Sequence, residues 1–321
     1  MRRIKKCTVF LLLLCLLLNL AGCAAAQKPL RVTLVLKTVT EVAEFWGTLL
    51  SGVEKAAEEY GVELEVLTSP REIDIDKQID LIRQVTEDKP DVMILSAADY
   101  DRCAEATEEA IAAGIGVVAI DTDVNAAGRA CFVGSNSYEI GLEMGRAMAS
   151  YLPEGGKVAV IQHMLTTTTG IERTRGVLDA LNEAGNIEIL GSFCCDNSTE
   201  QAQTITTELL SADPEIRGFV CTNEVCNVGA ANALVELGMG GRVYVVGCDN
   251  SQRQIQFLEQ NIIQAIVTQR PFNMGYVAVQ QAVRVANGEQ TDDFVEVSCV
   301  LITRENMYTQ ENQKLLFPVL R

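Results

Sequence analysis

Short runs of valine, isoleucine and leucine alternate with longer amphipathic segments from Leu30 almost to the end of the chain. This alternation is typical of repeated βα units, in which helices cover buried parallel strands. The runs predict strands at 31–36, 62–67, 91–95, 117–120, 131–134, 157–161, 187–191, 217–221, 243–247 and 263–268. The sequence therefore predicts an α/β fold built on parallel sheets.

The segments between these runs have the periodicity of helices that bury one face. In the first of them Leu49, Val53 and Ala57 recur at helical spacing, and Gly61 ends the segment. The pattern restarts after the turn-rich stretch 153–156, and no long proline- or serine-rich linker follows. A chain of 321 residues is long enough for about two domains. We therefore expect two similar Rossmann-like lobes packed side by side.

The first residues have the form of a secretion signal. A basic start precedes the run 9–20, which is apolar apart from Asn19 and shorter than the ~20 residues that a membrane-spanning helix needs. The run ends in Leu-Ala-Gly-Cys at 20–23, which looks like a bacterial lipobox. We expect residues 1–22 to be a lipoprotein signal peptide, Cys23 to carry a lipid and residues 23–29 to form a tether. An uncleaved anchor is the alternative.

Either form of this leader places the folded part outside the cytoplasm. A lipid on Cys23 would hold the protein at the outer face of the cytoplasmic membrane, or in the periplasm of a cell with two membranes. The chain has 43 acidic and 26 basic residues, and its net charge of −17 argues against a nucleic-acid partner.

Eight cysteines follow Cys23, and their number allows disulfides. A chain of this length does not depend on disulfides for stability, so we favour mostly free, buried thiols. The cysteines lack paired CxxC units, and the chain has a single histidine, His163. We therefore expect no metal and no other cofactor.

Polar side chains follow several of the predicted strands at the point where each strand ends. They are Asp121, Asn136, Asn223, Asp249 and Gln269. Open parallel sheets bind ligands at the carboxyl ends of their strands. Each of these residues could instead cap a helix, but five of them converging on two facing edges favour a ligand site.

Six motifs give the chain a resemblance to a known family. They are Glu44–Trp46, Val118–Asp121, Glu172–Gly176, Asn223–Glu224, Val246–Asp249 and Gln269–Gly275. Together, in this order and spacing, they resemble the type I periplasmic sugar-binding proteins of ABC importers, of the ribose-binding kind, over nearly all of residues 30–310. The resemblance implies two lobes joined by three crossovers, near Ser135, Arg270 and Ser298. The first lobe would comprise 30–135 plus 270–298, and the second 136–269 plus 299–321.

The resemblance also implies roles for individual side chains around a sugar. Aromatic rings match the C–H face of the sugar, carboxylates accept hydrogen bonds from its hydroxyls, and guanidinium and amide groups donate to its oxygens. By position these are Phe45 and Trp46 for stacking, Asp121 and Asp249 as acceptors, Arg173 as donor, and Asn223 and Gln269 as both donor and acceptor.

Some positions depart from the family pattern. Ala43 stands where an asparagine is usual, Thr122 where an arginine often follows the aspartate, and Asn197 where a second stacking aromatic is expected. We expect Asn197 to be one of the ligand-binding residues. Phe272 could supply the missing wall or support the hinge. A pentose, a hexose, a polyol or a related small polar molecule therefore all remain open.

As a whole, the resemblance implies a monomeric solute-binding lipoprotein. It would capture a sugar or polyol and deliver it to an ABC permease and its ATPase. A sensory lipoprotein that presents its closed form to a receptor or histidine kinase, and a protein for a non-sugar polar ligand, are the alternatives. An enzyme using Asp121 and Asp249 on a glycosidic bond is disfavoured, because no GxSxG motif, Walker loop or full dinucleotide fingerprint occurs.

Overall fold

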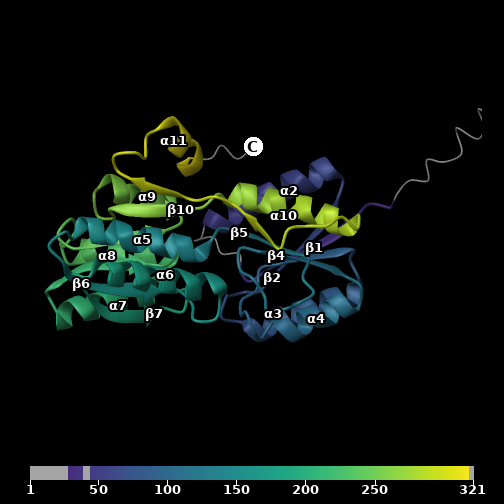
Figure 1. The fold of residues 1–321 in the computed structure, drawn as a ribbon, viewed down its shortest axis with the longest axis horizontal. Helices are drawn as coiled ribbons and strands as arrows, with labels where there is room; N and C mark the ends of the chain where they lie inside the picture. The colour runs from purple at the N-terminus through teal and green to yellow at the C-terminus, as the bar shows by residue number, and fades with distance from the viewer. Residues whose placement is uncertain (1–27, 39–43, 318–321) are drawn as a thin grey trace, which may run out of the picture.

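The computed structural model of the chain describes residues 28–38 and 44–317. In this part of the chain the strands form two six-stranded sheets, one in each half of an elongated molecule, and we call the halves the first and second lobes (Figure 1). The sheet of the first lobe contains β1 (Arg31–Leu36), β2 (Glu63–Thr68), β3 (Val92–Leu95), β4 (Gly116–Ile120), β5 (Cys131–Gly134) and β11 (Phe294–Glu296). The sheet of the second lobe contains β6 (Gly156–Gln162), β7 (Ile187–Cys194), β8 (Ile216–Cys221), β9 (Tyr244–Cys248), β10 (Ala265–Thr268) and β12 (Val300–Thr303).

The two sheets share one plan. The strand order is β11-β5-β4-β3-β1-β2 in the first lobe and β12-β10-β9-β8-β6-β7 in the second, so β1 corresponds to β6 and β4 to β9. The pairings are parallel, except that β12 runs antiparallel to β10. The predicted α/β fold with two similar lobes is confirmed.

Helices cover both faces of each sheet, as buried parallel strands require. In the first lobe, α2 (Glu44–Tyr60) and α10 (Pro271–Ala286) pack on one face, and α3 (Ile75–Asp88) and α4 (Ala104–Ala112) pack on the other. In the second lobe, α5 (Ser137–Tyr151) and α6 (Thr168–Ala184) lie opposite α7 (Thr199–Ala212), α8 (Glu224–Glu236) and α9 (Gln252–Glu259), and α11 (Gln310–Leu316) packs beside the last group.

The first helix illustrates how the sequence pattern determines packing. Leu49, Val53 and Ala57 of α2 are buried, as their spacing predicts, and the first two pack against the sheet. Gly61 follows the helix with a φ of 66°, a left-handed conformation that glycine adopts without steric cost and that ends the helix.

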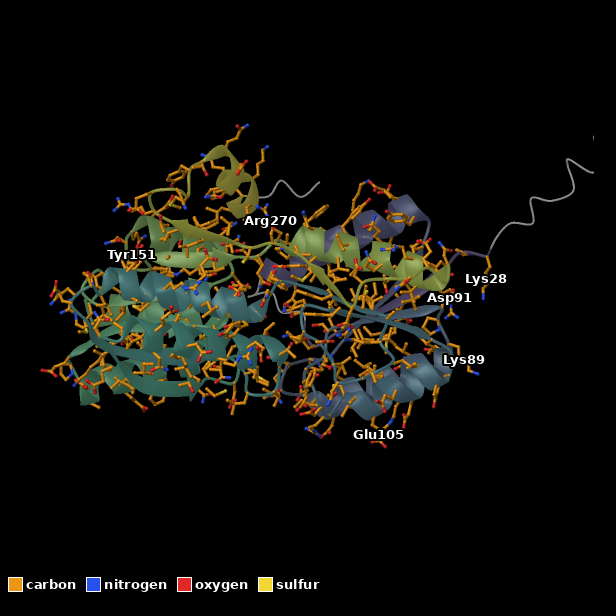
Figure 2. The ribbon with its side chains drawn as sticks, viewed as in Figure 1. Lys28, Lys89, Asp91, Glu105, Tyr151 and Arg270 are labelled. Atoms are coloured by element: carbon orange, nitrogen blue, oxygen red, sulfur yellow. The ribbon has the colours of Figure 1, made fainter. Side chains whose placement is uncertain are left out.

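The chain passes between the lobes three times, after β5, after β10, and between β11 and β12. Two of these crossings are tied together, because the Ser135 hydroxyl donates a buried hydrogen bond of 2.7 Å to the carbonyl oxygen of Val297. Arg270, which precedes α10, marks the remaining crossing at the junction of the lobes in Figure 2. The carboxyl ends of both sheets therefore face each other across these connections.

The described chain begins at Lys28, at the end of the first lobe remote from the second (Figure 2). The expected signal peptide (1–22), Cys23 and most of the tether lie outside the described residues. No helix in the described part of the chain is both long and apolar enough to cross a membrane. The eight cysteines of this part have free thiols, and all but Cys194 and Cys299 are buried.

Candidate functional site

A cavity of about 50 Å³ lies between the lobes at the carboxyl ends of both sheets. Its lining from the first lobe is Lys37, Thr38, Phe45, Trp46, Glu72 and Asp121. Its lining from the second lobe is His163, Thr169, Arg173, Asn197, Asn223, Glu224, Val225 and Asp249, with Gln269 just after β10. Both lobes therefore supply charged and polar side chains to one enclosed space. Eight of the nine residues expected at a ligand site lie here, and Asn136 does not.

Two aspartates occupy equivalent places in the two lobes. Asp121 follows β4 and Asp249 follows β9, and both have left-handed backbones, with φ of 62° and 67°. The N–H of Asp121 donates to Val133 at 3.0 Å and that of Asp249 donates to Val267 at 2.9 Å, so each turn is fixed to the neighbouring strand. Such backbone conformations cost about 1–3 kcal/mol each and occur most often at functional sites. The pairing of identical turns is consistent with a shared role at the cavity.

A buried ion-pair network holds the first-lobe side of the cavity. The Lys37 ammonium lies 2.7 Å from a carboxylate oxygen of Glu72 and 3.4 Å from one of Asp121. Burial lowers the pKa of Lys37, but the two carboxylates outweigh burial and leave that pKa raised. Burial raises the pKa of Asp121, while Lys37 and Arg173 oppose that rise. The lysine thus keeps its charge in a dry environment through its partners.

The second-lobe side is organised around Asp249. One Asp249 oxygen accepts a hydrogen bond of 2.6 Å from the Gln269 amide, and the other lies 3.7 Å from the Arg173 guanidinium. Arg173 also donates to the carbonyl oxygen of Thr222 at 2.9 Å, but its Nε atom is buried without a hydrogen-bond partner. An unpartnered buried donor costs free energy, so this N–H is available to an acceptor in the cavity.

The predicted aromatic pair lies at the cavity wall. Phe45 and Trp46 meet edge to face, with ring centroids 5.1 Å apart and an interplanar angle of 87°. The Lys37 ammonium lies 5.6 Å from the Trp46 ring centroid, a cation–π distance. Phe272 does not add a second wall, because it lines a separate groove of about 670 Å³ between α2 and α11.

Two asparagines extend the network from one lobe to the other. The Asn197 amide donates to Glu72 at 2.8 Å, and the Asn223 amide donates to the Asn197 oxygen, also at 2.8 Å. The Asn223 oxygen accepts from the backbone N–H of Cys226 at 3.1 Å and caps α8. Asn223 is therefore both a helix cap and a cavity residue, so the two sequence interpretations of this position are compatible.

Further hydrogen bonds join the lobes around the cavity. They run from Thr166 Oγ1 to the Ala98 carbonyl (2.9 Å), from Tyr100 N to the Thr166 carbonyl (3.0 Å), from Asp123 N to Thr168 Oγ1 (3.1 Å), and from Gln252 N to Glu44 Oε1 (3.1 Å). The lobes are closed on each other in this structure, which explains why charged cavity residues are almost fully buried.

Asn136 serves a different purpose from the one expected. Its side-chain oxygen accepts a hydrogen bond of 3.2 Å from the Glu139 N–H and caps α5. It lines another groove, beside Phe132 and Tyr138, and the structure does not bring it to the cavity between the lobes. The rule that site residues follow strands therefore predicted the correct sheet edge for Asn136. Its side chain, however, caps the helix that follows and does not enter the cavity.

Sequence reasoning missed several cavity residues. Lys37 follows β1 directly, so the same end-of-strand rule could have found it. Glu224 follows Asn223 and was noted only as part of a motif. Glu72 lies in the connection between β2 and α3, where no pattern in a single sequence distinguishes it from a surface glutamate.

His163 lines the cavity as a neutral imidazole. Its Nδ1 atom lies 2.7 Å from the Thr222 hydroxyl, and its Nε2 atom lies 3.3 Å from the Thr169 hydroxyl. Burial, and then the positive charges of Arg173 and Lys37, hold the pKa of His163 well below its ordinary value. A base that binds a proton so weakly suits hydrogen bonding and positioning more than proton transfer.

The cavity is thus built for a small molecule with many hydrogen-bonding groups. Acceptors, donors and a flat apolar wall converge from both lobes, and this combination matches a ligand that has hydroxyls around a C–H face. The residues that the structure describes contain no group of three or more His, Cys, Asp or Glu placed to hold a metal ion.

Comparisons with known proteins agree with this arrangement. The family model of the periplasmic binding protein domain matches residues 33–290. The D-allose-binding periplasmic protein of Escherichia coli is 25% identical over 303 residues, covering 90% of this chain and 96% of the relative. The D-apiose import binding protein of Paraburkholderia graminis is 28% identical, covering 73% and 75%.

Solved structures show the same fold. A carbohydrate transporter solute-binding protein from Agrobacterium radiobacter, in complex with D-arabinose, has a TM-score of 0.86 at 23% identity, covering 90% of this chain and 99% of that one. A sugar transporter from Clostridium phytofermentans has a TM-score of 0.79 at 29% identity, covering 85% and 98%. The chain therefore belongs to the periplasmic binding protein family and has the two-lobed fold of its type I sugar-binding members.

Proposed function

We propose that this protein captures a sugar or sugar-like small molecule between its lobes outside the cytoplasm and delivers it to an ABC import permease. The observation that carries the proposal is the closed cavity, in which Asp121 and Trp46 from one lobe face Arg173 and Asp249 from the other. Relatives with names that specify D-allose and D-apiose support a carbohydrate as the ligand.

Binding and closure are coupled in this proposal. A ligand can drive closure only if it binds the closed form more tightly than the open one, and a ligand that touches both lobes meets that condition. Charge-assisted hydrogen bonds to Asp249 and Arg173 supply the affinity, because each is worth about 1.5–3 kcal/mol. No bond of the ligand is made or broken.

The remaining features of the proposal concern the cell envelope. A lipid on Cys23 would tether a monomeric protein to the membrane, with the folded part carried on residues 23–29. Lys28 lies at the end of the first lobe remote from the second, so such a tether would leave the cavity and the hinge unobstructed. The lobes would move as units with boundaries near Ser135, Arg270 and Ser298.

Equilibrium dialysis against D-allose, D-ribose, D-apiose and D-arabinose tests the proposal. We expect saturable retention of at least one of these sugars by the leaderless protein. Asp249→Ala should weaken it about a hundredfold, because the change removes a charged acceptor and leaves Arg173 without its carboxylate. A cooperative melting transition would show that the variant is folded, although the loss of the Arg173 partner lowers its melting temperature. Retention of none of the four sugars, or near-normal affinity in the variant, contradicts the proposal or the place of Asp249 in it.

A further inference from the structure

Glu224 is a buried carboxyl group whose place in the cavity the network described above does not explain. It is the first residue of α8, it lines the cavity, and the residue is only 5% exposed. Its Oε2 atom is buried and has no hydrogen-bond partner. A buried acceptor without a partner costs free energy unless a group in the closed form donates a hydrogen bond to it.

The charged groups that act on Glu224 are themselves acidic. Asp249 lies beside it, because the Glu224 backbone N–H donates to an Asp249 oxygen at 3.3 Å, and Glu44 approaches from α2 of the other lobe. The Ser251 hydroxyl is the neutral group that faces it. This corner of the cavity thus places two carboxyl groups, those of Glu224 and Asp249, side by side.

The two cations that line the cavity are committed elsewhere. Lys37 is paired with Glu72 and Asp121, and Arg173 is engaged with Asp249 and a backbone carbonyl. Among the described lining residues, four carboxyl groups therefore face two cations. Among these lining residues, Glu224 is the carboxyl group that forms no ion pair with either cation.

We propose that the preferred ligand carries a protonated amine that pairs with Glu224, so that an amino sugar or an amino-polyol binds more tightly than the matching neutral sugar does. This inference rests on the proposed function and specifies the class of ligand for the same cavity. The amine would donate to the unpartnered Glu224 oxygen, while a hydroxyl or ring oxygen of the ligand accepts from the unpartnered Nε of Arg173.

An ammonium suits this corner better than a hydroxyl does. A hydroxyl would gain only a neutral hydrogen bond from the protonated Glu224 side chain, whereas an ammonium forms a stronger, charge-assisted hydrogen bond with the carboxylate. Burial and Asp249 raise the pKa of Glu224 to about 8, so the ligand-free group holds a proton at neutral pH. A bound ammonium favours the carboxylate, and that proton is then released to the solvent.

Isothermal titration with matched ligands tests the inference. The probes are the 2-amino-2-deoxy forms of D-glucose, D-galactose, D-mannose and D-allose, each compared with its parent hexose and its N-acetylated form at pH 7. We expect one amine to bind at least tenfold more tightly than both of its uncharged counterparts, with proton release seen as a dependence of the heat on the buffer. Glu224→Gln should bring the amine-to-hexose affinity ratio close to one, and Glu208→Gln, an exposed change on α7, should preserve it.

Two results would overturn the inference. One is a parent hexose that binds the unmodified protein as tightly as its amine, and the other is an amine preference that survives in Glu224→Gln. The first comparison needs no variant, so a folding defect in Glu224→Gln cannot obscure it. In both cases the proposed function would still stand if neutral sugars bind the protein and Asp249→Ala abolishes that binding. Absence of binding by every amine and every neutral sugar would contradict both.

Discussion

At the scale of single residues, Asn136 and Asn223 show how one sequence signal has two structural outcomes. Both residues follow a strand and both cap a helix. Only the Asn223 amide also takes part in the cavity, where it donates a hydrogen bond to the Asn197 oxygen. Serine also caps helices well, so an Asn→Ser change keeps the cap and removes only the amide.

This difference predicts different effects of the same substitution. Asn223→Ser should lower sugar affinity about tenfold, the value of roughly one buried hydrogen bond, whereas Asn136→Ser should leave affinity unchanged. Both variants should remain folded because both helices stay capped, with Asn223→Ser the less stable of the two because it loses the hydrogen bond to Asn197. Titration calorimetry with the best-retained sugar measures the affinities. Equal losses in the two variants would mean that the amide of Asn223 has no part in binding.

Glu224 also predicts a pH dependence of stability. Its pKa is raised from 4.5 to about 8 in the folded chain, chiefly by burial. Between these values the folded chain holds a proton that the unfolded chain has lost, so the free energy of unfolding falls as pH rises. The slope is at most about 1.4 kcal/mol per pH unit for one group.

Glu224→Gln should remove this slope. Urea unfolding at pH 5, 6.5 and 8 measures this effect. The free energy of unfolding of the variant should rise relative to that of the parent protein as pH rises, by up to about 4 kcal/mol at pH 8. The exposed Glu208→Gln change serves as the control and should follow the parent protein at all three pH values. A Glu224→Gln difference that is constant with pH would show that the carboxyl ionises normally in the folded state.

At the scale of elements, α2 and α10 hold the aromatic wall and the hinge together by close backbone approach. A Cβ atom at Gly52 of α2 would lie 2.0 Å from the carbonyl oxygen of Phe272, whereas one at Gly47 of the same helix would meet nothing within 4 Å. Gly52→Ala should therefore destabilise the protein by about 1–3 kcal/mol through overpacking. Gly47→Ala should stabilise it by about 0.5–1 kcal/mol, because alanine is the better helix former.

Denaturant unfolding of the two variants measures both effects. The pair is matched in helix and in chemistry, so opposite signs would identify backbone contact between α2 and α10 as the cause. A Gly52→Ala variant as stable as the parent protein would show that the helices separate without cost.

The elements were more predictable from the sequence than the site was. Ten strands were found because each contains a short apolar run, and in most of them that run is buried on both faces. The edge strands β2 and β7 are partly exposed, and β7 continues to Cys194, three residues beyond its expected end. The edge strands β11 and β12 were missed, because three or four partly exposed residues give no clear period. Glu72 was missed for another reason, since its role exists only where Lys37 and Asn197 of different lobes meet it.

At the scale of the whole molecule, the closed cavity is the feature that unites these details. Its lining comes from both lobes, and hydrogen bonds such as that between Thr166 and Ala98 close the lobes around it. The internal likeness of the two sheets places Asp121 and Asp249 at matching strand ends, so the site is a product of the duplicated plan. Ligand capture between the lobes is the central claim.

The fluorescence of Trp46 tests that claim most directly, because it is the only tryptophan of the chain and it lies in the cavity wall beside Phe45. The leaderless protein is titrated with the neutral sugars and the amino sugars, and its melting temperature is followed in parallel. We predict a saturable change in fluorescence for at least one sugar, with a rise in melting temperature that follows the same affinity. No saturable change with any of these ligands at millimolar concentration would contradict capture of a sugar between the lobes.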